Sequence, residues 1–393
     1  MSPRLVPTYA GDVPALLAAL RAALDGGPAL LPYADTPLPL LGHLPDGAFP
    51  DGDLPDGLAL AVATSGSTGS PKLSLLTASA LRASAAATHA VLGGPGRWLL
   101  ALTAAHIAGI QVLVRSVIAD LAPVLLDRSG PFEAGAFARA AGALGEGPAY
   151  TALVPTQVAR LLADPTGTAA LARFDAVLVG GAATPPSLRT RAADAGVRLV
   201  ATYGMSETAG GCVYDGRPLP GTRIALDADG RVRLGGPTLA SGYLGRPDES
   251  AAAFVESHGQ RWFVTDDLGE FARDGSLRIL GRRDDVIVTG GLKVHPRVVE
   301  EAALAHLPGV TGAVAVGVPD PQWGQAIVLA VTGTSAQVTT AEVRERLGGE
   351  LAAYALPKRV LVLDALPERG PGKPDRAAVA ARAIREAVGE WGA

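Results

Sequence analysis

The stretch LALAVATSGSTGSPK, residues 58–72, decides the fold class of this 393-residue chain. Its apolar start, LALAVA, predicts a buried strand. Glycines in the part that follows let backbone N–H groups approach an anion, hydroxyls can donate to phosphate oxygens, and the lysine adds a positive charge. It is not a Walker A loop, because no Gly-Lys-Ser/Thr triplet is present. We predict a phosphate-binding loop, with a flexible surface loop as the alternative, and its candidate ligands are Thr64, Ser65, Gly66, Ser67, Thr68, Gly69 and Lys72.

Strand and helix patterns alternate on both sides of this segment. Before it, Asp12 and an apolar stripe predict a capped amphipathic helix at 12–24, followed by a loop rich in Pro, Gly and Asp at 28–56. After it, predicted strands and helices alternate. This is typical of an α/β domain with a largely parallel sheet, whose ligand site lies at the carboxyl ends of its strands. The strands are expected at 97–102, 151–155, 176–181 and 198–204, and the helices at 107–119, from the second strand through 162, and at 185–195.

The pattern changes twice further along the chain. After about Gly204, short strands and turns dominate, among them the hairpin ARDGSLRILGR. From residue 284, helices and strands, one helix opened by the capping box Thr339–Glu342, predict a compact α+β domain. We therefore expect an α/β fold with a large N-terminal domain, 1–283, which has mostly parallel sheets and helices plus a β-rich portion. A small α+β C-terminal domain, 284–393, should follow, with an exposed, mobile Gly/Pro loop at 366–376.

The composition excludes several classes of protein. A net charge of −4 gives no sign of the basic face that nucleic-acid binding requires. No run reaches the roughly 20 apolar residues of a membrane span, and the N-terminus lacks the apolar core of a signal peptide. The single cysteine, Cys212, excludes an intrachain disulfide framework and fits a reducing cytosol. We therefore predict a cytoplasmic protein with small-molecule partners, no nucleic acid and no membrane span, and a homodimer as one assembly to consider.

Five motifs resemble those of the adenylate-forming superfamily, which includes acyl-CoA ligases, peptide-synthetase adenylation domains and luciferases. TSGSTGSPK resembles the phosphate-loop signature of that superfamily. The other four follow in the superfamily's order and nearly span the chain, which makes a chance match negligible. They are YGMSET (203–208), WFVTDDLG (262–269), GRRDD (281–285) and GPGKPDR (370–376), which resemble the superfamily's YGxTE, TGDLG, GRxDD and C-terminal loop with a catalytic lysine.

The resemblance implies formation of an acyl-AMP, in which a carboxylate attacks the α-phosphorus of ATP and pyrophosphate leaves. Both reactants are anions, so catalysis is mainly positioning and charge neutralisation. Lys373 is implied to bridge the attacking carboxylate and the α-phosphate, whereas a solvated loop lysine is the alternative. Glu207 is implied to hold Mg²⁺, a cation that prefers carboxylate oxygen. Tyr203 is implied to stack on adenine, with core packing as its alternative.

The same resemblance assigns the ribose contacts and the hinge. Asp267 is implied to accept from both ribose hydroxyls, and Arg282 to donate to the ribose. Asp266 stands where the family usually has glycine, so the identity of the ribose-binding acid is open, and the alignment favours Asp267. Asp284 occupies the hinge position between the domains, and an ordinary surface ion pair is the alternative for Arg282 and Asp284. The remaining implied nucleotide contacts are Gly180, Gly181, Ala182, Gly204 and Ser206, the last where threonine is usual.

In this superfamily the small domain rotates after adenylation, so the C-terminal domain is expected to be mobile. Lys373 then swings out, and the segment around Gly290 and Gly291 faces the tunnel through which a pantetheine thiol arrives. The resemblance thus implies ATP and Mg²⁺ as cofactors and coenzyme A as co-substrate. Coenzyme A and a carrier protein present the same thiol, so both acceptors stay open.

His106 opens the predicted helix at 107–119, just after a strand. It coincides with the superfamily's aromatic or histidine gate beside the acyl pocket, which makes it a catalytic candidate, and a structural histidine is the alternative. The segment RWLLAL…HIAGIQVLVRS and the short length most resemble the o-succinylbenzoate–CoA ligases of menaquinone biosynthesis. Their substrate has a second carboxylate that needs a donor. Arg115 is one candidate for the acid pocket, and a solvent-facing arginine is the alternative.

The expected function is therefore an AMP-forming acid–CoA ligase that activates 2-succinylbenzoate. One alternative is an acyl-CoA ligase, or a carrier-loading enzyme, for another aryl or acyl acid. A non-catalytic nucleotide-binding relative is another, against which the retention of Lys373, Glu207 and Asp267 argues. Amino-acid activation is disfavoured, because it needs an aspartate near the gate and residues 98–117 contain no acid.

Overall fold

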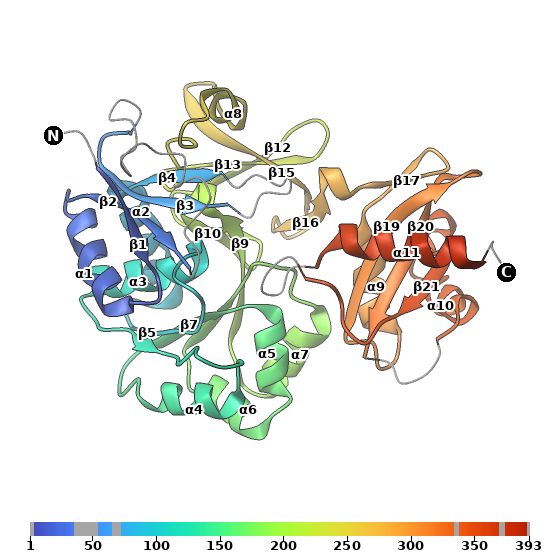
Figure 1. Cartoon of the computed structure of the whole chain (residues 1–393), viewed down its shortest axis with the longest axis horizontal. Coiled ribbons are helices and arrows are strands. Elements are labelled where there is room, and N and C mark those ends of the chain that lie inside the picture. Colours follow the sequence, from blue (N-terminus) through green and yellow to red (C-terminus); the bar gives the residue numbers. More distant parts are fainter. Residues whose placement is uncertain (1–3, 35–53, 65–71, 334–337, 369–373, 391–393) are drawn as a thin grey trace. The chain divides into compact units, whose positions relative to one another are not determined.

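The computed structural model describes residues 4–34, 54–64, 72–333, 338–368 and 374–390. The chain divides into two compact units, whose elements are labelled in Figure 1. The second unit includes Asp266 onward, because strand β15 (Gln260–Phe271) continues from one unit into the other. The hinge at Asp284 stays a prediction. The first unit consists of Met1–Gly181, Arg191–Asp227 and Val232–Thr265, and the second of Ala182–Thr190, Ala228–Arg231 and Asp266–Ala393.

A four-stranded sheet in the first unit carries the strand that precedes the phosphate-loop segment. That strand, β3, has the predicted bounds Leu58–Ala63 and is buried at every position but the last. It lies inside the sheet, parallel to β2 and antiparallel to β4, so the segment after it connects two paired strands. The order across the sheet is β1 (Leu5–Tyr9), β2 (Ala29–Tyr33), β3 and β4 (Leu73–Thr77).

The start of the loop predicted at 28–56 is wrong, because β2 lies there. Pro28 and Pro32 obscure a short apolar run that is buried and paired on both sides. Helix α1 (Val13–Leu24) contacts β2 and β3 and confirms its own prediction. The side chain of Asp12 caps it by accepting from the N–H of Ala15 at 3.1 Å. Residues 35–53 lie outside the described part of the chain.

A seven-stranded sheet forms the centre of the first unit. Five neighbouring strands are parallel, whereas β10 and β11 pair antiparallel at one edge. The predicted largely parallel sheet is thus confirmed, and the carboxyl ends of its parallel strands share one edge. The order is β11 (Arg217–Pro218), β10 (Gly210–Tyr214), β9 (Leu199–Met205), β8 (Ala176–Val179), β7 (Ala149–Leu153), β5 (Arg97–Leu100) and β6 (Val124–Leu125).

Helix α3 connects the core of this unit to the candidate site. It spans Ile107–Ala119, as predicted, and contacts α1, α2, β5 and β10 (Figure 1). Ile110 and Leu113 are fully buried beside Trp98 and Tyr150 in the main core. The other helices that follow β4 are α2 (Ala78–Leu92), α4 (Ala134–Gly142), α5 (Pro155–Leu162), α6 (Pro165–Leu171) and α7 (Pro186–Asp194).

A third sheet contains three antiparallel strand pairs, β12 with β13, β14 with β15 and β15 with β16, in the region where the sequence predicts short strands and turns. The predicted Asp-Gly turn joins β15 and β16, and Asp274 Oδ1 accepts from the N–H of Ser276 there at 3.0 Å. The strands are β12 (Arg223–Leu226), β13 (Arg231–Gly235), β14 (Phe254–Ser257), β15 and β16 (Leu277–Arg282), with α8 (Pro247–Ala253) before β14.

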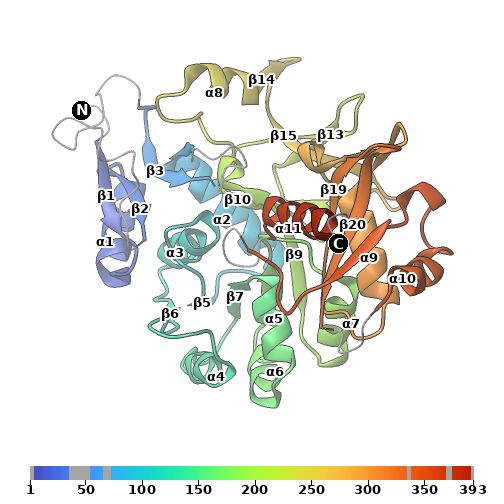
Figure 2. The same cartoon turned by 45° about the vertical axis from the view of Figure 1, so that its right-hand side comes forward.

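The second unit contains a three-stranded sheet with a core on each face. Along β19, Val314 and Val316 pack with Val379 of α11, whereas Ala315 packs with Val299 of α9. Figure 2 shows α9 and α11 flanking β19 and β20. The capping box is confirmed, since Thr339 and Glu342 exchange hydrogen bonds at the start of α10. The elements are β17 (Ile287–Thr289), β18 (Leu292–Val294), α9 (Pro296–His306), β19 (Gly312–Asp320), β20 (Gly324–Thr332), α10 (Thr340–Leu347), β21 (Arg359–Val362) and α11 (Arg376–Glu390).

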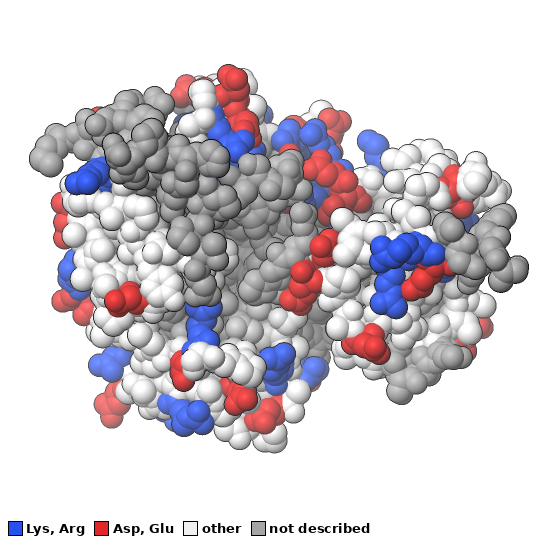
Figure 3. All heavy atoms as spheres, viewed as in Figure 1, with Lys and Arg blue, Asp and Glu red and all other residues white. Residues whose placement is uncertain are grey.

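Two surface properties bear on function. Within the described residues, none of the helices combines the length and the apolar character needed to cross a membrane. Lys, Arg, Asp and Glu side chains are interspersed among the described residues on the face shown in Figure 3, in keeping with the net charge of −4.

Candidate active site

The structure fixes both ends of the phosphate-loop segment. Thr64 follows β3 directly, and its backbone N–H donates to the carbonyl oxygen of Lys72 at 2.8 Å. Ala63 and Leu73 pair in the β3–β4 ladder, so the segment leaves and re-enters the sheet at neighbouring positions. The segment is thereby presented at the carboxyl end of β3. Its predicted ligands Ser65, Gly66, Ser67, Thr68 and Gly69 lie outside the described residues.

Lys72 lies in a small charged cluster. Its Nζ is 2.7 Å from Oε2 of Glu249 and 4.9 Å from the ring centroid of Tyr243. Arg246 pairs with the other oxygen of the same carboxylate. The hydrogen bonds from Lys72, and then from Arg246, lower the pKa of Glu249. Helix α8 thus supplies a counter-ion to Lys72 that sequence reasoning missed.

Glu207 is one of the few buried charged residues, with 8% of its surface exposed. It lies in the short 3-10 turn Ser206–Thr208 that follows β9. Thr208 holds this turn in place, because its Oγ1 accepts from the N–H of Met205 at 3.0 Å and donates to the carbonyl oxygen of Gly210 at 2.8 Å. The hydroxyl of Tyr243 donates to Oε1 of Glu207 at 2.9 Å. The turn and the tyrosine together orient the carboxylate.

Tyr243 therefore connects the first two sequence motifs. Its ring contacts Lys72, which ends the phosphate-loop segment, and its hydroxyl binds Glu207 of YGMSET. Ser206 adds a second link, since its Oγ donates to the carbonyl oxygen of Ala63 at 3.4 Å. A lysine and a carboxylate that are distant in sequence thus come together. A triphosphate and its metal ion need such a pair, because phosphate oxygens bind cations and Mg²⁺ binds carboxylate oxygen.

Glycines allow β8 and β9 to end close together. A Cβ on Gly180 would lie 2.4 Å from Oγ1 of Thr202, and Gly181 adopts a positive φ of 80°. Tyr203 is half-buried in β9 and shares the carboxyl edge with these glycines, because β8 and β9 are parallel. The predicted adenine-side residues are therefore neighbours, apart from Ala182, which begins a segment of the second unit.

Gly204 is required where β9 meets β10. A Cβ at this position would lie 2.1 Å from the carbonyl oxygen of Gly210, a distance that no side chain tolerates. Its neighbour across the ladder is Gly211, so the two strands approach closely just before the Ser206–Thr208 turn. The motif therefore needs its glycine for packing, whatever else it binds.

Helix α3 carries the two residues predicted for the acid pocket. His106 is exposed and precedes the first turn, where its carbonyl oxygen accepts from the N–H of Ile110 at 3.0 Å. Its role as a gate stays a prediction. Arg115 is 3% exposed, so the alternative that it faces solvent is wrong. The reason is that α3 packs on all sides, against α1, α2 and the central sheet.

The predicted ribose contacts belong to the second unit. Asp267 and Arg282 are direct partners in the β15–β16 ladder. Asp266 pairs with two arginines, Arg231 at 2.9 Å and Arg282 at 3.3 Å. Burial alone would lower the pKa of Arg282, but Asp267, then Asp266 and Asp284, raise it overall. Arg282 also pairs with Asp284 at 3.3 Å, in a partly exposed contact.

The glycines predicted for the thiol tunnel form the turn between β17 and β18. Gly290 and Gly291 have positive φ values of 57° and 78°. The N–H of Gly290 donates to the carbonyl oxygen of Trp323 at 2.8 Å, and a Cβ on Gly290 would lie 2.9 Å from the indole ring. Trp323 is 37% exposed, and Nζ of Lys358 lies 4.5 Å from its ring centroid. Neither residue was predicted, because one exposed tryptophan carries no local pattern.

Lys373 lies outside the described residues, but the chain on either side of it is described. Glu368 and Pro374 form an antiparallel bridge, and the N–H of Asp375 donates to the carbonyl oxygen of Pro367 at 2.7 Å. The two ends of the lysine segment are therefore held together. Arg376, at the start of α11, pairs with Asp285 and Glu300.

A magnesium ion fits the residues around Glu207. Groups of three or more His, Cys, Asp or Glu suited to a metal are absent from the part of the chain that the structure describes. Mg²⁺ needs no such cage, because one or two carboxylates hold it together with water and substrate phosphates. The carboxylate of Glu207, with the hydroxyl of Tyr243 on it, meets that requirement.

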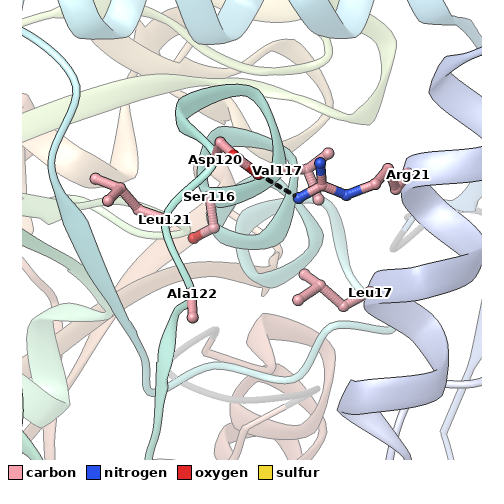
Figure 4. Close-up of a pocket in the computed structure, with 7 residues that line it drawn as sticks. All are labelled: Leu17, Arg21, Ser116, Val117, Asp120, Leu121 and Ala122. Carbon is pink, nitrogen blue, oxygen red and sulfur yellow. Dashed lines mark hydrogen bonds and ion pairs between the residues drawn. The ribbon is translucent and has the colours of Figure 1, made fainter.

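A cavity of about 250 Å³ lies between α1 and α3, as Figure 4 shows. The ion pair of Arg21 and Asp120, at 2.8 Å, lies at its edge, and neither residue belongs to a predicted motif. The cavity adjoins the C-terminal end of α3, whereas His106 precedes the N-terminal end, about 20 Å away for a helix of this length. It therefore plays no part in the candidate active site. Its other lining residues are Leu17, Ser116, Val117, Leu121 and Ala122.

Comparison with known proteins gives family matches to both parts of the chain. The family model described as AMP-binding enzyme matches residues 31–244. The model described as AMP-binding enzyme C-terminal domain matches residues 300–373. The two matches include three of the five motifs in whole or in part, and together they cover most of the chain.

Relatives and solved structures agree with these matches. A protein named probable 2-succinylbenzoate–CoA ligase from Mycobacterium tuberculosis is 47% identical over 390 residues, which cover 98% of this chain and 99% of that protein. A sulfoacetate–CoA ligase from Cupriavidus necator is 34% identical, over 93% of this chain and 72% of its own length. The structure of o-succinylbenzoate CoA synthetase from Bacillus subtilis, in complex with the acyl-adenylate intermediate OSB-AMP, superposes with a TM-score of 0.73 at 26% identity, covering 93% of this chain and 80% of that one.

Proposed function

The chain belongs to the AMP-binding enzyme family, and we propose that it joins 2-succinylbenzoate to coenzyme A through an acyl-AMP intermediate. ATP is consumed, pyrophosphate leaves in the first half-reaction, and AMP leaves in the second. The observation that carries this proposal is the 47% identity to a 2-succinylbenzoate–CoA ligase along the full length of both chains. The α/β fold with a small α+β unit is the fold of the adenylate-forming enzymes.

The first half-reaction needs an anionic nucleophile to approach an anionic phosphate. A carboxylate oxygen forms a bond to the α-phosphorus, and the bond from that phosphorus to the bridging oxygen of pyrophosphate breaks. In our proposal, Lys72 leaves Glu249 for the phosphates of ATP, and Lys373 neutralises the charge between the carboxylate and the α-phosphate. The contact between Lys72 and Glu249 supports this role, since it holds the ammonium group of the lysine against an anionic oxygen at the end of the phosphate-loop segment, where a phosphate oxygen could take its place.

Glu207 holds the magnesium ion in this proposal. The ion would neutralise charge on the phosphate oxygens of ATP. Glu207 offers it a buried carboxylate, and Tyr243 orients that carboxylate through the hydrogen bond at 2.9 Å. Because Tyr243 also contacts Lys72, one side chain positions both groups that meet the triphosphate.

In our proposal, residues of the sequence motifs bind the adenosine. Tyr203 stacks on the adenine beside Gly180, Gly181 and Ala182, and the β8–β9 edge supports this arrangement. Asp267 accepts from the ribose hydroxyls and Arg282 donates to them. The position of Asp267 directly before Leu268 and Gly269 in the motif supports its choice as the ribose-binding acid.

In the second half-reaction, the thiol of coenzyme A attacks the acyl carbon, and the acyl–oxygen bond to AMP breaks. We propose that the C-terminal domain moves at Asp284 and presents the turn of Gly290 and Gly291 to the thiol. The two glycines of this turn support the proposal, because a pantetheine arm can pass where no side chain protrudes. Lys358, whose Nζ lies over the ring of Trp323, supports it as well, because a lysine suits the phosphates of coenzyme A. A reducing cytoplasm is the proposed location, supported by the single cysteine, Cys212.

A second acid is a specific alternative, because a relative named sulfoacetate–CoA ligase is 34% identical to the chain. The test is mass spectrometry of products formed from ATP, Mg²⁺, coenzyme A and each acid in turn. We expect 2-succinylbenzoyl-CoA and AMP from 2-succinylbenzoate, and no thioester when coenzyme A is left out. A thioester formed only from sulfoacetate or another acid would keep the reaction and overturn the substrate.

A further inference from the structure

The turn that carries Glu207 ends in an unfavourable backbone conformation. Ala209, which follows the turn, has a φ of 51° and a ψ of 40°, in the left-handed region. Aspartate and histidine are among the side chains that tolerate this region best, whereas the methyl group of alanine only brings the steric penalty. A contact from outside the turn must therefore hold Ala209 in place. Among the described residues, the others with a positive φ that are not glycine are Asp120, Asp215 and His258.

Side chains from two helices bind the carbonyl oxygen of Ala209. Oγ of Ser84 on α2 donates to it at 3.0 Å, and Nε2 of Gln111 on α3 donates to the same oxygen. Both side chains belong to residues that are only 1% exposed, and Ala209 itself is fully buried. A buried carbonyl that loses its donors has no water to replace them, so these hydrogen bonds favour the backbone conformation that makes them possible.

Gln111 is better explained by the hydrogen bond that it donates than by packing in the core. The orientation of its amide is fixed, because the carbonyl oxygen of Ala209 can only accept and the NH2 group must face it. This leaves Oε1 of Gln111 buried without a hydrogen-bond partner among the described residues, which is unfavourable for stability. An apolar side chain of the same length would fill the same space without an unpaired oxygen.

The conformation of Ala209 bears directly on Glu207. The N–H of Ala209 donates to the carbonyl oxygen of Ser206 at 3.2 Å, which closes the turn around Glu207. The carbonyl oxygen of Glu207 accepts from the N–H of Ala240 at 2.9 Å, and its carboxylate accepts from the hydroxyl of Tyr243. Because Ala209 lies two residues after Glu207, a change in its φ and ψ would displace the turn and the carboxylate with it.

We propose that Ser84 and Gln111 are positioning residues for Glu207. Through the carbonyl oxygen of Ala209, they hold the turn in the geometry in which the carboxylate of Glu207 binds Mg²⁺. The inference rests on the proposed function and adds to it two residues that lie outside the five sequence motifs. Neither residue binds the metal ion in this scheme, so each acts only through the backbone of the turn.

The test measures pyrophosphate release with 2-succinylbenzoate and saturating ATP over a range of Mg²⁺ concentrations. The variants are Ser84→Ala, Gln111→Met and the combination of the two. We expect each single variant to raise the Mg²⁺ concentration for half-maximal activity about 2- to 10-fold, the effect of one lost hydrogen bond, and the double variant about 10- to 100-fold. The single variants keep the proposal testable if the double variant fails to fold.

Ala209→Gly, added to the double variant, distinguishes positioning from packing. Glycine adopts the left-handed region without a steric penalty, so the turn can keep its geometry after both donors are lost. We expect this addition to reverse most of the increase in the Mg²⁺ requirement. A change that acted only through the packing of α2 and α3 would not be reversed, because glycine restores no contact with either helix.

Ser116→Ala is the matched control. Ser116 is also 1% exposed and lies on α3, but its hydroxyl donates to the carbonyl oxygen of Val112 in the same helix. Its loss removes a buried hydroxyl without changing any contact of the Glu207 turn. We therefore expect an unchanged Mg²⁺ requirement in this variant.

The outcomes separate this inference from the proposed function. If Glu207→Gln raises the Mg²⁺ requirement but the double variant does not, or if Ala209→Gly reverses nothing, Ser84 and Gln111 are structural residues and the inference falls alone. If Glu207→Gln leaves the Mg²⁺ requirement unchanged, the proposed metal site falls, and the inference falls with it. Wild type that releases no pyrophosphate with 2-succinylbenzoate would overturn the proposed function and the inference together. A raised Mg²⁺ requirement that Ala209→Gly reverses supports both.

Discussion

Nε of Arg376 lies 3.2 Å from Oδ2 of Asp285, which joins the end of the motif with the predicted catalytic lysine to the motif with the predicted hinge. The same guanidinium pairs with Glu300 and donates to the carbonyl oxygen of Ala315 at 2.9 Å. Burial would lower the pKa of Arg376, but Glu300, and then Asp285, raise it overall. The segment that carries Lys373 is thus anchored at its C-terminal end to the residue after the predicted hinge position.

The two acids of this network should differ in their effect on stability. We expect Glu300→Gln to lower the free energy of unfolding by about 3 kcal/mol, because its carboxylate is mostly buried and is one of the two that pair with Arg376. Asp285→Asn, at a more exposed position, should cost about 1 kcal/mol. Urea denaturation measures both. Glu386→Gln, in an exposed pair with Arg382, is the control and should stay within 0.5 kcal/mol or so. Equal effects of all three would contradict the network.

Tyr243 should matter through Glu207. We expect Glu207→Gln to reduce acyl-AMP formation by roughly 10²-fold or more, because the carboxylate proposed to hold Mg²⁺ is lost. Tyr243→Phe removes only the hydroxyl on Glu207 and should reduce the rate by about 10-fold while raising the Mg²⁺ concentration needed for half-maximal activity. Pyrophosphate release against Mg²⁺ concentration distinguishes the two. An unchanged Mg²⁺ requirement in both variants would show that Glu207 holds no metal.

Lys373 should act in one half-reaction. Lys373→Ala is expected to reduce acyl-AMP formation by roughly 10²-fold or more, the scale of removing one preorganised donor. Thioester formation from supplied acyl-AMP should survive much better, since the lysine swings out for that step in the proposed scheme. Arg369→Ala, a change to another cation of the same sequence segment, should affect neither step strongly. An equal loss of rate in both half-reactions of Lys373→Ala would contradict the proposal that Lys373 acts only in acyl-AMP formation.

The buried His89 should make the protein less stable in mild acid. Burial, and then Arg115, lower its pKa from the ordinary 6.5, so the unfolded chain binds a proton there more readily than the folded one. The free energy of unfolding should therefore fall as the pH drops below about 6.5. Urea denaturation at pH 7.5, 6.5 and 5.5 measures the slope, and His89→Gln should flatten it. A slope that is unchanged in the variant would mean that another group causes it.

The sequence predicts much of the fold because its strongest patterns are local. LALAVA and the helix at 107–119 have the predicted bounds, since an apolar run before a Gly/Ser segment and a long apolar helix leave few alternatives. The strand Ala29–Tyr33 was missed, because two prolines obscure it and its burial comes from its neighbours in the sheet. Helix α11 was also missed, since its sequence is rich in alanine, which is abundant throughout the chain and therefore a weak helix signal here.

The residues of the candidate site also fall into two groups, those that the sequence identifies and those that only the fold brings together. Residues within motifs, such as Glu207 and Asp267, could be named from the sequence because their neighbours identify them. Glu249 and Tyr243 could not, because each meets Lys72 only after the chain has folded. The burial of Arg115 was equally hidden, since almost every neighbour on its helix is apolar and no polar face marks which side meets solvent.

The central claim is that the chain makes an acyl-AMP from 2-succinylbenzoate. Exchange of labelled pyrophosphate into ATP, measured without coenzyme A, tests it most directly, because the exchange requires a reversible first half-reaction and nothing else. We expect exchange that depends on both Mg²⁺ and 2-succinylbenzoate and that disappears in Glu207→Gln. Folded protein that binds ATP yet shows no exchange with 2-succinylbenzoate, or exchange that proceeds without any acid, would contradict the account.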